Sequence, residues 1–577
     1  MTPAAPRIVE RPVPAGVDAL AREADLPPIL ARLYAARGVT AARELDPALA
    51  ALPDPAALPG MDAAVDLLLR ARREETRLCV VGDYDADGAT STAVLVTGLA
   101  ALGFRAVDHL VPDRMTLGYG LTPELVDLAA EGTEAPELLV TVDNGIAAHA
   151  GVAAARARGM DVLVTDHHLP ADTLPDAAAL LNPRLADGPT EFDAVAGVGV
   201  AFFLLAALRR RLRETGALEG DGPNLAALLD LVALGTVADV VPLDRVNRIL
   251  VGQGLARMRA GRARPGIEAL AAVAGRDRRR LAAADLGFAL APRLNAAGRI
   301  DDMALGIACL LASDPTEARQ RAERLDALNR ERREIEATMR AEALAATARL
   351  TLDGALPAAL CLHDPGWHPG VVGIVASRVK ERVHRPVIAF APDGQGSLRG
   401  SARSIPDFHV RDALAAVDAR HPGLVIRFGG HAMAAGLTLE AGRLDAFAAA
   451  FAEQAARSLD PATLRGEHVT DGELAPAELD LATAELLERA GPWGQGFPEP
   501  EFHGVFEVAS ARVVGEAHLR LELRDEAGRR IPAIAFGAVE QGWADPPGRV
   551  RTVYRLAVDR WRGDARLQLQ LRHLEPA

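Results

Sequence analysis

The sequence contains one lysine, Lys380, among its 64 lysine and arginine residues. A phosphate-binding loop of the form G-x-x-x-x-G-K-[ST], a kinase-type lysine and a nucleotidyl-transferring lysine are all missing. This disfavours P-loop motors, kinases and lysine-dependent ligases. Any contact with phosphate must use arginine, backbone amides, hydroxyls, histidine or a metal ion, and the planar fork of arginine suits phosphate well.

Cysteine is also scarce, and no stretch suits a membrane. Cys79, Cys309 and Cys361 are far apart and form no C-x-x-C pair, so neither a disulfide framework nor a structural zinc site is expected. The N-terminus has no apolar core of a secretory signal. The longest apolar run, Ala194 to Leu208, contains two glycines and is too short to span a bilayer. We therefore expect a soluble, cytoplasmic protein that does not bind membranes.

The length of 577 residues is too great for a single hydrophobic core, so several domains are expected. A hydrophobic content of 49% indicates a folded, globular chain. The net charge of −14 argues against a surface that binds nucleic acid everywhere. It does not argue against a local basic patch, because net charge averages over the whole surface.

Three carboxylates, Asp83, Asp85 and Asp87, stand at alternate positions after the apolar run Leu78 to Val81. That run predicts a short buried strand, and the residues from Gly88 onward predict a helix. The carboxylates are thus expected at the carboxyl edge of a sheet, where divalent cations that prefer oxygen can bind. A calcium loop of the EF-hand type does not match, because it needs a glutamate at its twelfth position and the residue here is valine. On this motif alone, a solvated acidic turn remains an alternative.

The same pattern recurs along the chain. Strands are predicted at Ala106 to Val111, Leu138 to Val142 and Val162 to Val164, alternating with helices as in a parallel sheet. Polar residues follow the last two of these strands, and a third apolar segment, Leu229 to Val241, carries another carboxylate. These polar residues are Asp143, Asp166, His167, His168 and Asp239. A histidine pair alone is more often structural, but its place after a strand beside carboxylates favours a metal site.

Four motifs in this order resemble those of the DHH phosphoesterase superfamily. They are Asp83–Gly88, Thr141–Gly145, Asp166–His168 and Gly235–Asp239. Within this superfamily, the chain is most similar to the RecJ family of bacterial exonucleases specific for single-stranded DNA. Gly429–Gly436 resembles the signature of the second domain of these enzymes, and Gly491–Pro500 resembles the turn before the third. Phe497-Pro498 departs from the pattern, because the family more often has Asn-Pro there.

The resemblance implies a centre of two divalent cations, Mn²⁺ or Mg²⁺. The implied ligands are Asp85, Asp87, Asp143, His167 and Asp239, with Asp143 as the bridge. His168 is implied to contact the scissile phosphate. Asp83 and Asp166 are further candidates, either as ligands or as groups that orient the ligands.

The resemblance also implies a multidomain α/β fold. Its parts are a parallel-sheet DHH domain, a long connector helix, a second α/β domain of the DHHA1 type and a C-terminal OB-fold barrel. The expected ranges are a lead-in at 1–70, the DHH domain at 71–245, a helical region with the connector at 246–350, the DHHA1-type domain at 351–460 and the OB-fold at 461–577. The connector is the charged helical stretch from Thr316 to about Leu350.

A site for the 5′-phosphate is implied by segments that match the pocket of RecJ-like enzymes. Its candidates are Arg114, Arg299, Ser401, Arg403 and His431. We expect Arg299 in a loop between helices, Ser401 and Arg403 in a loop at 397–404, and His431 in a glycine-rich loop. The alternative is that these arginines only pair with acidic residues between domains.

The last hundred residues contain about five short runs of alternating apolar and polar residues, which predict a small barrel. By the resemblance this barrel is an OB-fold, whose basic and aromatic face binds single strands. The candidate contacts are Arg512, His518, Arg520 and Trp561.

The predicted function is a metal-dependent exonuclease that hydrolyses single-stranded DNA from the 5′ end to 5′-mononucleotides during recombination and repair. The expected partners are single-stranded DNA, a helicase and a single-strand-binding protein, and the chain is expected to be a monomer. One alternative is a phosphoesterase for pyrophosphate, oligoribonucleotides or cyclic dinucleotides, which has no use for a C-terminal barrel. Another is an inactive DNA-binding scaffold, which the complete ligand set argues against.

Overall fold

The computed structural model describes residues 6–112, 117–131, 135–352, 356–394, 396–460, 463–539, 541–560 and 563–577. The chain divides into two units. The N-terminal unit comprises Val13–Asn329 together with Arg489–Glu499. The C-terminal unit comprises Arg330–Glu488, Pro500–Ala577 and the start of the chain up to Pro12. The five domain ranges expected from the sequence stay predictions.

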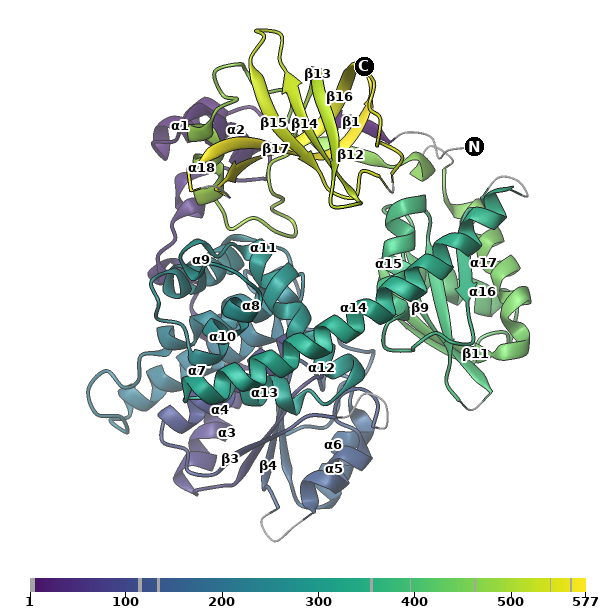
Figure 1. Ribbon diagram of the computed structural model, residues 1–577. Helices are drawn as coiled ribbons and strands as arrows, with labels where there is room; N and C mark the ends of the chain where they lie inside the picture. The colour runs from purple at the N-terminus through teal and green to yellow at the C-terminus, as the bar shows by residue number, and fades with distance from the viewer. Residues whose placement is uncertain are drawn as a thin grey trace. The chain divides into compact units, whose positions relative to one another are not determined.

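A parallel sheet of five strands lies in the N-terminal unit, in the order β3-β2-β4-β5-β6 (Figure 1). Its strands are β2 (Leu78–Val81), β3 (Val107–Leu110), β4 (Leu138–Val142), β5 (Asp161–Thr165) and β6 (Ala179–Leu181). Strands β2 and β4 are buried throughout, which explains why every residue in them except Thr141 is apolar. The predicted parallel sheet is therefore confirmed.

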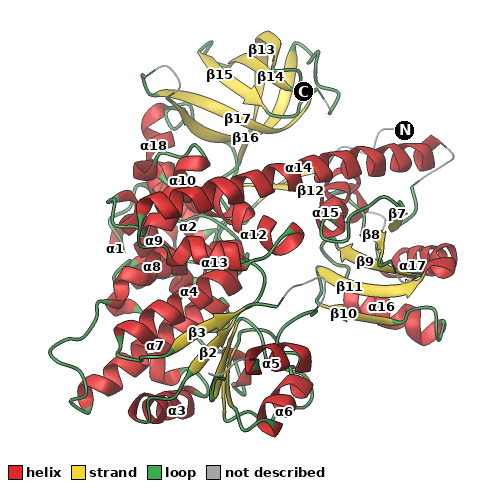
Figure 2. Ribbon diagram, turned by 60° about the horizontal axis from the view of Figure 1, so that its bottom comes forward, coloured by secondary structure: helices red, strands yellow, loops and turns green. Residues whose placement is uncertain are grey.

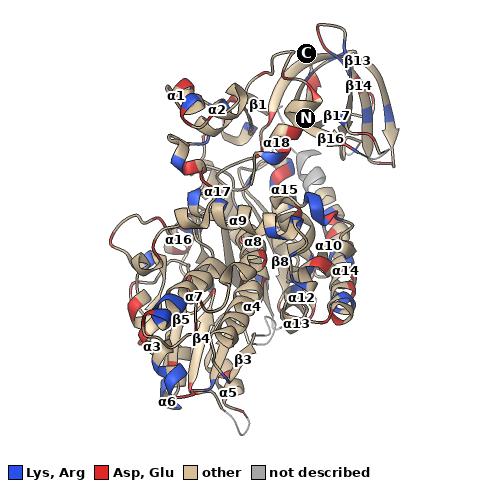
Figure 3. Cartoon of the chain, turned by 90° about the vertical axis from the view of Figure 1, so that its left-hand side faces the viewer, with Lys and Arg blue, Asp and Glu red and all other residues tan. Residues whose placement is uncertain are grey.

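Helices pack on this sheet and around it. They are α3 (Met61–Arg73), α4 (Ala86–Ala101), α5 (Pro123–Ala130), α6 (His149–Ala157), α7 (Gly197–Glu214) and α8 (Leu229–Ala238). Helices α4 and α8 are almost free of charged residues (Figure 3), because nearly all of their side chains are buried. The apolar segment that carries Asp239 is thus a helix, and Asp239 lies at its C-terminal end and not after a strand.

The rest of the N-terminal unit is helical. It contains α1 (Val17–Glu23), α2 (Pro28–Ala35), α9 (Arg245–Arg259), α10 (Pro265–Val273), α11 (Ala283–Asp285), the π-helical turn η7 (Leu286–Leu290), α12 (Ala291–Ile300) and α13 (Ala304–Leu311). The predicted loop around Arg299 was wrong, because these residues form α12. Asn295 and Gly298 suggested a loop, but Gly298 allows the helix to pack directly on the carbonyl of Tyr84. The predicted connector is confirmed as α14 (Pro315–Leu352), of 38 residues.

A mixed sheet in the C-terminal unit has the order β10-β11-β9-β8-β7 (Figure 2). Its elements are β7 (Leu360–His363), α15 (Val372–Val383), β8 (Val387–Pro392), β9 (Ser397–Arg403), α16 (Val410–Arg420), β10 (Arg427–Gly430), β11 (Ala434–Glu440) and α17 (Leu444–Ser458). The predicted loop at 397–404 was wrong, since β9 is a central strand. Its small residues are needed there, because Gly400 packs on the ring of Phe390.

The glycine-rich segment 429–431 is only partly a loop. Gly429 and Gly430 end strand β10, and the turn begins at His431, whose N–H donates to the carbonyl of Ala434.

The predicted barrel is confirmed, and it is closed in the order β13-β14-β15-β17-β16. Its strands are β13 (Phe502–Val514), β14 (His518–Arg524), β15 (Arg530–Ala535), β16 (Arg549–Asp559) and β17 (Arg566–Pro576). Before it come β12 (Glu467–Thr470), which pairs in parallel with β1 (Arg7–Glu10), and helix α18 (Leu481–Arg489). Across the described ranges, no helix has both the length and the apolar character needed to cross a membrane.

Candidate functional site

Seven acidic and histidine side chains meet at the carboxyl edge of the parallel sheet. They come from the ends of β2, β4 and β5 and from the end of α8. Their possible ligand atoms form three overlapping groups, within each of which all atoms lie within 4.8 Å of one another. These groups are Asp83, Asp85 and Asp143; Asp143, His167 and His168; and Asp87, His167 and Asp239. The structure therefore brings together every predicted metal-ligating residue.

Asp143 and His167 each belong to two of these groups, and Oδ1 of Asp143 lies 3.0 Å from Nε2 of His167. The side chain of Asp143 is almost fully buried, and its backbone adopts a left-handed conformation with φ of 62°. Such conformations are uncommon for residues other than glycine and occur often at functional sites. Helix α7 begins so close to this residue that a Cβ atom at Gly197 would lie 2.7 Å from the Cβ of Asp143. A glycine is therefore required at the start of α7.

Backbone amides at two helix starts orient Asp85 and Asp87. Asp85 caps α4, because its Oδ1 accepts hydrogen bonds from the N–H groups of Asp87 and Gly88 at 2.9 and 3.0 Å. The carboxylate of Asp87 accepts from the N–H groups of Gly197 and Val198 at 2.7 and 3.0 Å. The positive end of the α7 dipole favours this negative charge. Both carboxylates are thus fixed in direction before any cation binds.

Asp166 is bonded differently. Its Oδ1 accepts from the N–H groups of His167 and His168 and lies 2.7 Å from Nδ1 of His168, while its Oδ2 accepts from the N–H of Ile146. Burial lowers the pKa of His168, but the hydrogen bond and the charge of Asp166 outweigh burial and leave this pKa above its ordinary value. The geometry therefore suits Asp166 to orienting His168 more than to binding a cation.

The cluster carries more negative charge than a buried site tolerates. Burial raises the pKa of Asp143 well above its usual range, and the charges of Asp87 and Asp85 raise it further. Burial and Asp85 together raise the pKa of Asp87 to about 7, although its amide hydrogen bonds oppose the shift. Burial and Asp87 likewise raise the pKa of Asp239.

Divalent cations fit this centre. They would supply the positive charge that the clustered carboxylates lack. The Oδ1 atom of Asp143 is also buried and, although it lies 3.0 Å from Nε2 of His167, it accepts no hydrogen bond from the part of the chain that the structure describes, so it is available to bind a cation. Mixed oxygen and imidazole ligands suit Mn²⁺ as well as Mg²⁺.

The crowding predicts that Asp143→Asn raises the melting temperature of the metal-free protein at pH 8 by several degrees. The pKa of Asp143 is raised in the folded state, so folding favours the protonated form. This carboxyl therefore lowers stability as pH rises above its unfolded pKa. The amide removes that penalty, and melting curves in EDTA measure the change. At pH 4 the difference should shrink, because the carboxyl is then largely protonated.

Added Mn²⁺ should reverse this order. A cation that binds the folded state stabilises it, and the wild type should bind Mn²⁺ more tightly than the variant because it keeps the Asp143 carboxylate. If the variant melts below the wild type in EDTA at pH 8, the clustered carboxylates do not destabilise the metal-free protein.

The predicted phosphate-binding residues of the C-terminal unit also meet at one corner. Ser401 and Arg403 project from the same face of β9, and Nη1 of Arg403 donates to Oγ of Ser401 at 3.0 Å. A Cβ atom at Gly373, in the first turn of α15, would lie within 3 Å of both side chains. The turn that starts at His431 lies beside them, since Ala434 pairs with Arg403 in the sheet.

The other two candidates of the phosphate site are Arg299 and Arg114. Arg299 is in α12 of the N-terminal unit, and Arg114 lies outside the described residues.

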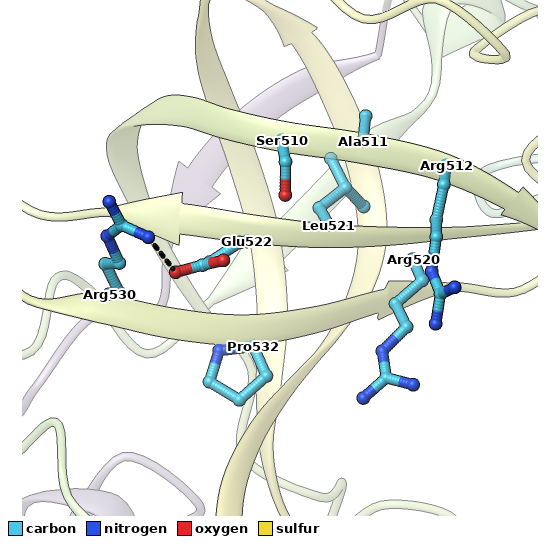
Figure 4. Close-up of a pocket in the computed structure, with 8 residues that line it drawn as sticks. All are labelled: Ser510, Ala511, Arg512, Arg520, Leu521, Glu522, Arg530 and Pro532. Atoms are coloured by element: carbon cyan, nitrogen blue, oxygen red, sulfur yellow. Dashed lines mark hydrogen bonds and ion pairs between the residues drawn. The ribbon is translucent and has the colours of Figure 1, made fainter.

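A hollow of about 460 Å³ lies on the barrel between β13, β14 and β15 (Figure 4). Arg512 and Arg520 occupy directly opposite positions on β13 and β14, and their side chains extend in the same direction. Neither makes an ion pair within the described ranges, whereas the neighbouring Arg530 pairs with Glu522 at 3.1 Å. Like charges directly opposite one another are unfavourable in a sheet, so this pair favours an anionic ligand.

The other predicted barrel contacts differ in how well the structure supports them. The ring of His518 packs edge-on against Phe536, and its Nδ1 accepts from the N–H of Gly537. It is therefore already engaged in the barrel. Trp561 lies outside the described residues.

Comparison with known proteins agrees with this arrangement. The chain matches the models of the DHH family N-terminal domain at residues 77–236, the DHHA1 domain at 354–457 and the RecJ OB domain at 470–573. It is 52% identical to the single-stranded-DNA-specific exonuclease RecJ of Escherichia coli, over 96% of both chains. Identity to the RecJ of Thermus thermophilus is 37%, over 94% of this chain and 74% of that protein.

The chain belongs to the RecJ family. The crystal structure of the RecJ of Thermus thermophilus in complex with Mn²⁺ is 34% identical and has a TM-score of 0.81, covering 99% of this chain and 79% of that one. A second crystal structure of that RecJ, in complex with Mg²⁺, has a TM-score of 0.76 at 32% identity and covers 99% of this chain and 78% of that one.

Two residues of this RecJ-family site were missed in the sequence. Asn144 donates from Nδ2 to the carbonyls of Val81 and Val142, which ties the ends of β2 and β4 together beside the carboxylates. Tyr119 is half exposed, its hydroxyl lies 3.3 Å from the carbonyl of Asp143, and its ring meets that of His168 edge-on. Asn144 follows Asp143 directly and could have been suspected. Tyr119 had no such signal.

Proposed function

We propose that this chain is a metal-dependent exonuclease that degrades single-stranded DNA from the 5′ end to 5′-mononucleotides. The single observation that carries the proposal is the cluster of seven acidic and histidine side chains at the sheet edge, in a chain 52% identical to a single-stranded-DNA-specific exonuclease. We further propose that it acts in DNA repair and recombination in the cytoplasm, as a monomer, on strands supplied by a helicase and a single-strand-binding protein.

Asp85, Asp87, Asp143, His167 and Asp239 would hold two divalent cations, with Asp143 between them and Asp83 as a further ligand. When bound, such cations activate a water molecule and neutralise charge on the attacking and leaving oxygens of a phosphodiester. The chain itself fixes the ligands. Buried backbone amides hold Asp85 and Asp87, and the left-handed backbone of Asp143 turns its side chain into the cluster.

His168 would contact the scissile phosphate. Its raised pKa favours the protonated imidazole, which can donate to a phosphate oxygen. Asp166 holds Nδ1 and leaves Nε2 for that contact. Half-exposed Tyr119 stands beside it and offers a ring to the nucleotide.

Recognition of the strand end is assigned to arginines and a hydroxyl. Ser401 and Arg403 would bind a terminal phosphate next to the first turn of α15, where backbone N–H groups favour anions. Arg299, Arg114 and His431 are proposed as further contacts. An enzyme that binds a 5′-phosphate in this way releases nucleotides from that end.

The barrel would bind a further part of the strand. We predict that the double variant Arg512→Ala, Arg520→Ala raises the KM for a 40-nucleotide strand at least about tenfold and leaves kcat within about twofold, since each arginine would contact the phosphate backbone. The steepness with which binding falls with salt should also decrease. Steady-state kinetics at two salt concentrations measure both effects.

Arg524→Ala is the matched control for this double variant. Arg524 is also on β14, but it pairs with Glu507 at 3.2 Å, so its removal should change KM little. If the control raises KM as much as the double variant does, the barrel attracts the strand only through its total charge and not through contacts of Arg512 and Arg520.

The alternatives make different demands on the chain. A phosphoesterase for pyrophosphate, oligoribonucleotides or cyclic dinucleotides needs no barrel with opposed arginines. An inactive scaffold would be expected to lose at least one ligand of the cluster, whereas all seven side chains are present.

Incubation of the purified protein with Mn²⁺ and one substrate at a time tests the proposal. The substrates are a single strand, a blunt duplex of the same sequence, a short RNA and pyrophosphate. We expect mononucleotides from the single strand and almost none from the duplex. Faster turnover of pyrophosphate or short RNA would favour the small-substrate alternative, and binding without hydrolysis would favour the scaffold.

A further inference from the structure

Phe288 has the most exposed large apolar side chain in the described part of the chain, with 85% of its surface accessible. Phe288 lies in the π-helical turn η7, whose residues Leu286, Ala289 and Leu290 are buried. A single exposed apolar residue needs no special explanation by itself. Phe288 is of interest because contacts made by its neighbours in the chain join this segment to the two segments that carry Asp239 and Asp83–Asp87.

The first contact joins the π-helical turn η7 to the end of α8. A Cβ atom at Gly287 would lie 3.2 Å from Cγ1 of Val237, two residues before Asp239. Val240, directly after Asp239, is 63% exposed and has a left-handed φ of 62°. Beta-branched residues rarely adopt this conformation, so the chain holds a second apolar side chain outward beside the cluster.

The second contact joins the following helix to the carboxylate loop. Turn η7 continues directly into α12, where Oδ1 of Asn295 accepts from the N–H of Ala86 at 2.8 Å. Gly298, one turn later, packs on the carbonyl of Tyr84. Phe288 precedes Asn295 by seven residues, or roughly 10 Å along the helix axis. The backbone of Phe288 is therefore about two helical turns from a residue that contacts the Asp83–Asp87 loop.

The π-helical turn itself explains how the ring reaches solvent. A π-helical turn contains an extra residue compared with an α-helical turn, and such turns are frequent at functional sites. Leu286 and Leu290 are buried at its two ends, while Phe288 between them is exposed. The turn thus presents an aromatic ring without disturbing the packing beneath it.

We propose that Phe288 stacks a nucleobase of the strand held at the carboxylate cluster, within a few nucleotides of the scissile bond. This inference rests on the proposed function. Every base has an aromatic face, so one phenylalanine can hold any sequence, as a non-specific nuclease requires. Val240 would extend the apolar contact on the side of Asp239. Neither residue was suspected from the sequence.

Single-strand binding by Phe288→Ala tests the proposal, in EDTA so that no hydrolysis occurs. Loss of one stacked base should weaken binding about tenfold. With Mn²⁺, KM should rise by a similar factor while kcat stays within about twofold. Phe288→Trp should restore both, because indole also stacks.

Strands with one abasic nucleotide, moved stepwise from the 5′ end, locate the contact. At one position, or two adjacent positions, the wild type should bind as weakly as Phe288→Ala, and the variant should lose nothing more. Elsewhere the tenfold difference should persist. A difference that persists at every position would overturn the proposal, since the ring would then contact no base. Equal binding by wild type and variant on the intact strand would overturn it as well.

Leu128→Ala is the matched control, because Leu128 is an exposed apolar residue on α5 of the same unit. It should change neither binding nor melting temperature, and Phe288→Ala should melt with the wild type. Failure of the proposed function has a separate readout, the digestion of an intact strand by the wild type.

Discussion

Replacement of Asp143 by alanine is expected to abolish hydrolysis of single-stranded DNA, with a loss of more than about 1000-fold in kcat/KM. Changes to groups that only support metal ligands cost about 10–100-fold, and Asp143 is proposed to bind the cations directly. It is shared by two of the three ligand groups, so its loss disturbs both halves of the centre. Initial rates at saturating Mn²⁺ measure the effect.

Asp108→Asn provides the matched control, because Asp108 is on β3 of the same sheet but its side chain is 91% exposed. The control should keep wild-type activity. Activity of Asp143→Ala within about tenfold of the wild type at saturating Mn²⁺ would refute the two-cation assignment.

Arg403→Ala is expected to lower kcat/KM on 5′-phosphorylated strands by about 2–4 kcal/mol, or roughly 30- to 1000-fold. The side chain is held by Ser401 and lies beside the first turn of α15. A terminal phosphate would lose a charge-assisted hydrogen bond that a 5′-hydroxyl never forms. Strands with a 5′-hydroxyl should therefore be affected much less, and parallel kinetics on both substrates measure the difference.

Arg399→Ala controls for a general loss of positive charge, since Arg399 is exposed on the same face of β9. It should affect both substrates alike and only slightly. If Arg403→Ala slows both substrates equally, Arg403 contributes to the fold or to general strand binding and not to recognition of the end.

The parallel sheet and its acidic edge could be predicted because local and global signals agree there. Leu78–Val81 is apolar throughout and Leu138–Val142 is apolar except for Thr141, as expected for strands buried on both faces, and a carboxylate motif follows each. The barrel could be predicted equally well from the sequence, since alternate residues of β14 face the core and the solvent. In these segments the residue pattern and the tertiary packing favour the same secondary structure.

Helix α12 and strand β9 could not be predicted, because contacts with distant residues decide their structure. Asn295 and Gly298 are poor helix formers, but they contact the loop that carries Asp83–Asp87. Gly400 weakens a strand in isolation, yet the ring of Phe390 requires it.

The same limit applies to the candidate site. Tyr119 and Phe288 are ordinary residues in the sequence. Only the structure shows that both are exposed, Tyr119 against the ring of His168 and Phe288 in a turn that packs on the end of α8. Asp166 could be predicted as part of the motif, but its orienting geometry is visible only in its hydrogen bonds to the backbone and to His168.

The order in which nucleotides leave a doubly labelled strand tests the central claim most directly. A single strand with a 5′-phosphate would carry one fluorophore on its first nucleotide and another on its last, and would be digested with Mn²⁺ under single-turnover conditions. The account predicts that the first product is the 5′-terminal mononucleotide, with the 3′ label released last. Early release of the 3′ label, or of short oligonucleotides from either end, would contradict it.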